Sequence, residues 1–118
     1  MTTQEQIKAL KDRTEVLHRV LSIEDRRSKV SAMEEQSQAP DFWNDPKAAE
    51  RFLKGLNAEK AWVNSYDKVR SAVEDLGVLY EFARESMVGA SDDAALSEEA
   101  RELDDAFAQA LGKVEDLE

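Results

Sequence analysis

The sequence has no cysteine, two prolines, four glycines and a single histidine in 118 residues. The lack of cysteine excludes disulfide bonds and thiolate metal sites, and it fits a reducing cytosol. Metal sites that need two histidines are excluded as well, because His18 stands alone. We interpret His18 as a surface or boundary residue. Few glycines and prolines favour long helices over a strand-rich fold.

Long hydrophobic runs are also missing. No stretch approaches the ~20 apolar residues of a membrane span, and MTTQEQIKALK lacks the apolar core of a secretory signal. We therefore expect a cytoplasmic protein with no membrane partner.

Motifs for chemistry are absent from the sequence. There is no Gly-rich phosphate loop, and the acidic pairs Asp92–Asp93, Glu98–Glu99 and Asp104–Asp105 lack the spacing of a calcium loop. Nothing indicates a nucleophile or a general base. We predict no catalytic residue, no cofactor and no metal, and hence no enzyme.

Charge is abundant and unevenly distributed. The net charge is −10, yet residues 1–30 hold seven Lys and Arg against five Asp and Glu. The acidic remainder would repel a phosphate backbone, so little direct nucleic-acid binding is expected. If a cationic contact face exists, its candidates are Arg26, Arg27 and Lys29; the alternative is a solvated helical face.

Apolar spacing predicts three long helices. Over residues 4–37, Ile7, Leu10, Thr14, Leu17 and Leu21 form one stripe, and Val16, Val20, Ile23 and Val30 form a second, adjoining stripe. The broad apolar face predicts one helix packed against two others. Over residues 46–87, an unbroken 4-3 spacing is followed by Trp62, Tyr66, Val69, Val73, Leu76, Tyr80, Ala83 and Met87. Leu96, Ala100, Leu103, Phe107, Ala110, Val114 and Leu117 repeat it over residues 93–117.

An aromatic and proline-rich corner, residues 38–45, separates the first two helices. Pro40 disfavours helix at the residue before it. Asp45 is a suitable N-cap and Pro46 a suitable first helical residue. We expect Phe42 and Trp43 to fold inward as a plug over the bundle end.

Together these patterns predict an all-α single domain, 1–118. It is a bundle of three long antiparallel helices with coiled-coil-like packing, and residues 88–92 form the second turn. In such a bundle the C-terminus lies at the corner's end. The N-terminus and the Gly89–Asp93 turn lie at the opposite, free end.

The corner QAPDFWNDPKAA resembles the corner in the first, helical domain of the bacterial class I peptide chain release factors, on the factor 2 side of that family. The stretches QIKALKDRTEVLHRVLSIEDRRSKVSAMEEQ, VRSAVEDLGVLYEFARE and LDDAFAQALGKVEDLE are similar to other helices of that domain. Resemblance thus covers nearly the whole chain.

The resemblance implies a role in translation termination at UAA and UGA codons. The family's Ser-Pro-Phe codon-reading tripeptide and its catalytic Gly-Gly-Gln loop are not in this sequence, so no such residue is carried over. What remains is a docking or positioning module toward the ribosomal stalk base and the recycling GTPase, with Asp92 and Asp93 as candidate partner contacts. The alternative is a free-standing helical scaffold that self-associates, since an isolated bundle could form a homodimer through its stripes.

Overall fold

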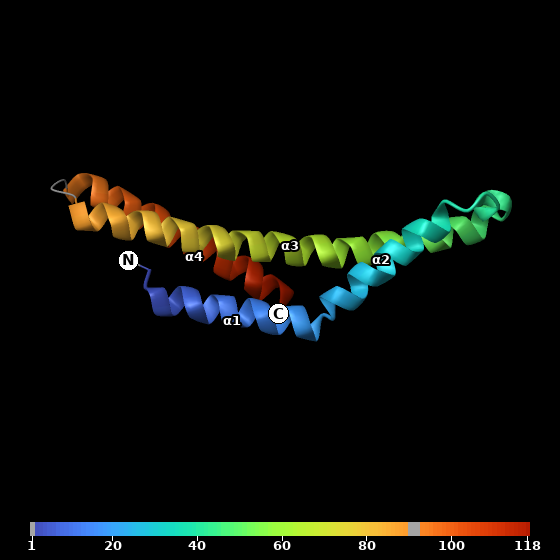
Figure 1. Ribbon diagram of the computed structural model, residues 1–118, viewed down its shortest axis with the longest axis horizontal. Coiled ribbons are helices and arrows are strands. Elements are labelled where there is room, and N and C mark those ends of the chain that lie inside the picture. The colour runs from blue at the N-terminus through green and yellow to red at the C-terminus, as the bar shows by residue number, and fades with distance from the viewer. Residues whose placement is uncertain (1, 90–92) are drawn as a thin grey trace. The chain divides into compact units, whose positions relative to one another are not determined.

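The computed structural model describes the backbone of residues 2–89 and 93–118, and the side chains of residues 2–85 and 98–118 (Figure 1). Its elements are α1 (Gln4–Val20), α2 (Ile23–Ser37), a 3-10 helix η1 (Phe42–Asn44), α3 (Pro46–Gly89) and α4 (Asp93–Leu117). The described ranges contain no strand, so the all-α prediction is confirmed. The prediction of three helices is not, because those ranges contain four α-helices.

The helix predicted over residues 4–37 is interrupted at Leu21 and Ser22. Ser22 adopts a left-handed conformation with φ 51° and ψ 50°, which ends the right-handed helix. The guanidinium of Arg26 donates through Nε to the Leu21 carbonyl at 2.7 Å, so a helix-end acceptor gains a partner. A glycine or proline at this position would have predicted the break from the sequence, but residues 21 and 22 are leucine and serine.

The chain divides into two compact units. Unit 1 comprises Met1–Leu17 and Lys68–Glu118, and unit 2 comprises His18–Asp67. Each is described here by itself. Unit 1 packs most of α1, the second half of α3 and α4 around an apolar core whose most buried side chains are Leu10, Leu76, Leu103 and Val114.

The start of α1 follows from local capping. The Thr3 hydroxyl accepts from the Gln6 N–H at 3.2 Å, and the Gln6 side-chain oxygen accepts from the Thr3 N–H at 2.8 Å. This reciprocal capping box fixes the first turn. Ile7, Leu10, Thr14 and Leu17 are buried, as the first predicted stripe requires.

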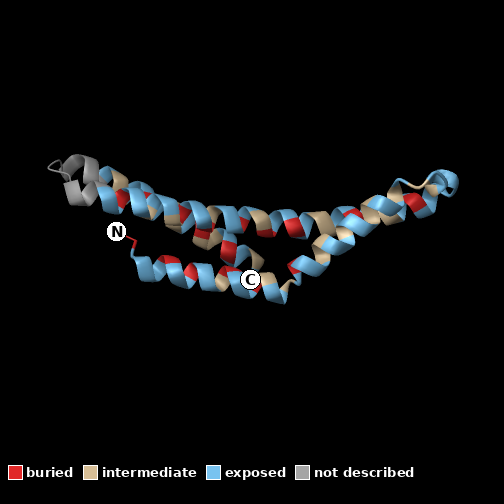
Figure 2. Cartoon of the chain, viewed as in Figure 1, coloured by how far each residue is buried: buried red, intermediate tan, exposed pale blue. Residues whose placement is uncertain are grey.

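Unit 2 is a hairpin of α2 and the first half of α3. In α2 only Ile23 is buried, while α3 contributes Ala49, Leu56, Val63 and Tyr66. Most other residues of α2 are exposed or half-buried (Figure 2). Two helices thus share a narrow apolar seam, and much of each helix faces solvent.

The corner of unit 2 has the predicted start of α3. The Asp45 carboxylate accepts from the Ala48 N–H at 3.2 Å, directly before Pro46. The predicted plug is wrong for Trp43, whose residue is 61% exposed. Its ring contacts Phe42 edge-on, at 5.2 Å between centroids. Phe42 itself is half-buried because it packs against Phe52 at 5.4 Å.

The second predicted stripe of the first helix is also corrected. Val16 and Val20 are 45% and 72% exposed, whereas Ile23 is fully buried. The break after Val20 changes the helical phase, so Ile23 faces the core without these two valines. In α3, Trp62 leaves the predicted stripe and is 42% exposed.

The predicted place of the C-terminus is wrong too. Arg13 Nε donates to Glu118 Oε2 at 3.0 Å, and a second guanidinium nitrogen contacts the other carboxylate oxygen. Glu118 therefore lies beside α1 in unit 1, whereas the corner belongs to unit 2. The reason is length, because α4 has 25 residues and α3 has 44. A helix that short cannot follow α3 back to the corner.

Candidate functional site

The predicted cationic residues of α2 lie together, and carboxylates of α3 hold them. Arg26 Nη1 lies 2.9 Å from Glu59 Oε2, and Lys29 Nζ lies 3.4 Å from Glu59 Oε1. Arg27 meets Asp67 through two guanidinium nitrogens, with Nη1 at 3.2 Å from Oδ2. Bidentate pairing of this kind is directional as well as electrostatic. Their use as partner contacts stays a prediction, and it would require sharing these ion pairs.

The electrostatics of this cluster follow from those bonds. The hydrogen bond from Arg26 lowers the pKa of Glu59, and Lys29 acts in the same direction. The hydrogen bond to Asp67 raises the pKa of Arg27. Charged partners that stabilise each other leave a nearly neutral seam. The cluster is therefore suited to holding α2 against α3.

Arg26 also packs on an aromatic ring. Its guanidinium carbon lies 5.3 Å from the centre of the Trp62 ring, a cation–π distance. Close by in the sequence, His18 Nε2 lies 3.0 Å from Glu24 Oε1, and its ring meets Tyr66 at 5.5 Å. His18 is half-buried, which confirms its interpretation as a boundary residue.

The two acidic candidates are not placed. Asp92 lies outside the described residues, and Asp93 begins α4 with a side chain that also lies outside them. Their role as partner contacts stays a prediction. Of the corner residues, Pro40, Asp45 and Pro46 are exposed.

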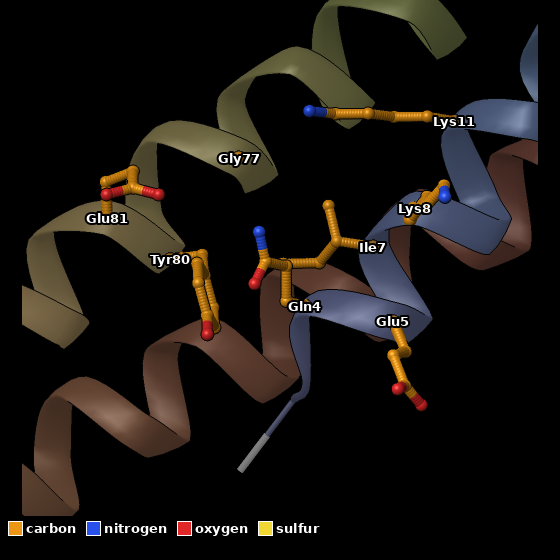
Figure 3. A pocket seen from close by; sticks show the side chains of 8 residues that line it. All are labelled: Gln4, Glu5, Ile7, Lys8, Lys11, Gly77, Tyr80 and Glu81. Carbon is orange, nitrogen blue, oxygen red and sulfur yellow. The ribbon is translucent and has the colours of Figure 1, made fainter.

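Unit 1 carries a groove between α1 and α3, seen in Figure 3. Its volume is about 310 Å³, and its lining comprises Gln4, Glu5, Ile7, Lys8, Lys11, Gly77, Tyr80 and Glu81. The Lys11 side chain extends from α1 toward α3 above Gly77 (Figure 3). A Cβ at Gly77 would lie 3.4 Å from Lys11 Nζ, the flexible end of a side chain, so the space here does not require glycine. The mixed lining holds no nucleophile–base pair.

Sequence reasoning missed an exposed apolar face on α3. Whereas Val73, Leu76 and Ala83 of the same helix are buried, Val78 is 54% exposed and Phe82 is 62% exposed. A second groove, of about 470 Å³, is lined by both and by Lys11, Glu74, Gly77, Glu81 and Glu85. The signal was present: positions 78 and 82 are four apart and lie off the buried stripe of Val69, Val73, Leu76 and Ala83.

Two polar contacts link the α1 segment with the α4 segment in unit 1: Thr2, before α1, with Asp104 inside α4, and Arg13 inside α1 with Glu118 after α4. Thr2 donates to Asp104 through its N–H at 2.6 Å and through its hydroxyl at 2.7 Å. These bonds lower the pKa of Asp104. The Arg13 pair likewise lowers the pKa of Glu118 and raises that of Arg13. Both carboxylates are thus occupied in structural bonds.

The described ranges lack both metal-binding groups and membrane-spanning helices. No group of three or more His, Cys, Asp or Glu side chains there is arranged to hold a metal ion. No helix there is long and apolar enough to cross a bilayer.

What the described residues define is a class of protein, an all-α helical module. Similarity to named proteins narrows this class to one kind of protein. The "Peptide chain release factor 2" of Streptomyces avermitilis is 35% identical over 81 residues, which cover 69% of this chain and 22% of that protein.

Mycobacterial relatives extend the match. The "Peptide chain release factor 2" of Mycobacterium ulcerans is 34% identical over 95 residues, or 80% of this chain and 25% of that protein. That of Mycobacterium avium is 31% identical over 100 residues, or 85% of this chain and 26% of that protein. The predicted resemblance to release factor 2 is thus confirmed. The chain spans about a quarter of the length of these curated relatives.

Two other comparisons found nothing: no family model matches the chain, and no solved structure matches it.

Proposed function

We propose that this chain is the N-terminal helical domain of a peptide chain release factor 2. In that role it is a non-catalytic docking module of a protein that terminates translation at UAA and UGA codons. The similarity to release factor 2 over 67–85% of the chain carries the proposal. The all-α architecture of the described residues supports it, because a module that positions other parts needs rigid helices more than a pocket.

The sequence supports a division of labour within the longer protein. No two glycines adjoin in this chain, and neither proline follows a serine, so the catalytic and codon-reading motifs of the family belong elsewhere. The ribosome is the partner expected for a release factor. The finer assignment, to the ribosomal stalk base and the recycling GTPase, rests on the family resemblance.

A segment exchange tests the proposal. In the Streptomyces avermitilis release factor 2, the 81 residues that match this chain would be replaced by the corresponding 81 residues of the chain. We expect the chimera to release peptide from ribosomes stalled at UAA and UGA, and to be recycled by the GTPase, at rates close to those of the parent. The matched control is the same factor with the segment deleted.

A chimera that releases peptide but is no better recycled than the deletion would leave only a spacer role. One that matches the deletion in both assays would contradict the proposal. The isolated 118-residue chain should release no peptide in the same assay.

A further inference from the structure

The exposed face of α3 in unit 1 is unusual for a packed helix. Val78 and Phe82 are neighbours on the helix surface because they are four residues apart. Single exposed apolar residues are common on proteins. Two large ones side by side, next to a groove of about 470 Å³, are the pattern of an interaction surface.

Phe82 borders a second hollow on its other side. That hollow has a volume of about 270 Å³ and is lined by Leu79, Phe82, Ala83, Glu99, Glu102 and Leu103 from α3 and α4. The ring of Phe82 therefore stands between two shallow grooves of the same unit. A side chain from a partner could lie in either groove and contact the ring.

The charge around this ring has one dominant sign. Among the described residues, the lining of the two grooves comprises five carboxylates, namely Glu74, Glu81, Glu85, Glu99 and Glu102, and the ammonium of Lys11. Arg70 partly offsets Glu74, since their side chains lie 3.0 Å apart. An acidic rim around an apolar centre is complementary to a basic partner that carries an apolar anchor.

We propose that the face formed by Val78 and Phe82, with its acidic rim, docks a basic amphipathic helix of a partner protein. Nucleic acid does not fit, because its phosphates would meet the five carboxylates. A second copy does not fit, because two copies of an acidic patch on a chain of net charge −10 repel each other. This inference rests on the proposed docking function and names the surface and the partner chemistry.

The test uses the 118-residue chain and a defined probe. The probe is a fluorescein-labelled peptide of about five helical turns, built from leucine and lysine at helical spacing. Binding is followed by fluorescence anisotropy. A peptide with glutamate in place of lysine is the negative probe, and we expect it not to bind.

Three variants locate the binding. Phe82→Ala should weaken binding at least ~tenfold, as expected for a central aromatic anchor. Glu81→Lys should weaken it by a similar factor. Glu35→Lys makes the same charge change at an exposed position of α2, and it should stay within about twofold of the parent. Circular dichroism checks that each variant is folded. If Phe82→Ala is unfolded, Glu81→Lys alone tests the site.

Two results would overturn the proposal. Equal weakening by Glu81→Lys and Glu35→Lys, with no effect of Phe82→Ala, would mean general attraction to an acidic protein. A dimer in sedimentation that Phe82→Ala converts to a monomer would assign the face to a second copy. An active chimera combined with either result would remove this surface and leave the proposed function standing. An inactive chimera combined with site-specific peptide binding would contradict the proposed function and support this surface.

Discussion

The two units of this chain hold their helices together by different interactions. Ten of the fifteen buried apolar residues identified in the described ranges lie in unit 1, where three helical segments enclose them. Unit 2 has the other five, along a two-helix seam. Ion pairs between helices are instead concentrated in unit 2. There Arg26, Arg27, Lys29 and Lys60 all pair with carboxylates of the same unit.

The difference shows what a third helix contributes. Three helices can enclose a side chain from all directions, so apolar burial supplies most of the stability of unit 1. Two helices leave their outer faces wet, and half-exposed ion pairs are weak. Unit 2 should therefore be the less stable half of the chain, and the more sensitive to charge.

The largest expected effect removes core from unit 1. Leu76 is fully buried, and Leu76→Ala should lower the free energy of unfolding by ~2–5 kcal/mol, through lost burial and a residual cavity. Leu79→Ala, at a 37% exposed position three residues on, is the matched control and should cost about 1 kcal/mol or less. Urea unfolding measures both. Equal costs would mean that unit 1 is not organised around this core.

Acid should act on unit 2 first. The pKa of Glu59 is lowered in the folded state by Arg26, so its contribution is present above the ordinary value of 4.5 and is lost as pH falls through the lower, folded value. Asp104 and Glu118 of unit 1 also have lowered pKa values, but its larger apolar core does not titrate. Amide exchange followed by NMR should therefore show protection falling in α2 before it falls in unit 1. Glu59→Gln should flatten this dependence, and the control Glu50→Gln should not. Simultaneous loss in both units would contradict the comparison.

Replacing serine by glycine should have opposite effects on the free energy of unfolding at the α1–α2 break and inside α2. Ser22→Gly should raise the free energy of unfolding by up to ~1 kcal/mol, because glycine accepts the left-handed conformation without steric cost. Ser31→Gly, inside α2, should lower it by ~0.5–1 kcal/mol. Thermal unfolding measures both shifts. A loss at Ser22 as well would indicate a continuous helix.

The smallest effect is expected at the corner. Trp43→Ala should cost ~1 kcal/mol or less, since the exposed ring has one edge-on contact, with Phe42. Phe52→Ala, which removes the other partner of Phe42, should cost more. A melting shift at Trp43 as large as that of a core residue would support the predicted plug, with a buried Trp43 ring.

Sequence reasoning succeeded where periodicity decides the structure. The buried faces at Ile7, Leu10, Val73 and Val114, and the cap at Asp45, follow from 3-4 spacing and capping chemistry. The break at Ser22 was not predictable in the same way. Serine is tolerated within helices, and only the three-dimensional contact of Arg26 with the Leu21 carbonyl reveals what compensates it.

The candidate site was predictable in kind and less so in place. Sequence indicated a module without catalytic residues, and a cationic group at Arg26, Arg27 and Lys29. It could not show that Glu59 and Asp67, 30 to 40 residues away, pair with those cations. Nor did it single out Phe82, because an exposed phenylalanine and a buried one look alike until the neighbouring helices are placed.

One measurement tests the central claim, that this chain is a docking module of a longer termination factor. An antibody to the chain would be used to isolate the endogenous protein for intact-mass spectrometry and peptide sequencing. The account predicts a mass of about three times 13.3 kDa, since 81 matched residues are 22% of one relative and 100 matched residues are 26% of another, with peptides that contain Gly-Gly-Gln. A product of 13.3 kDa that ends at Glu118 would contradict it.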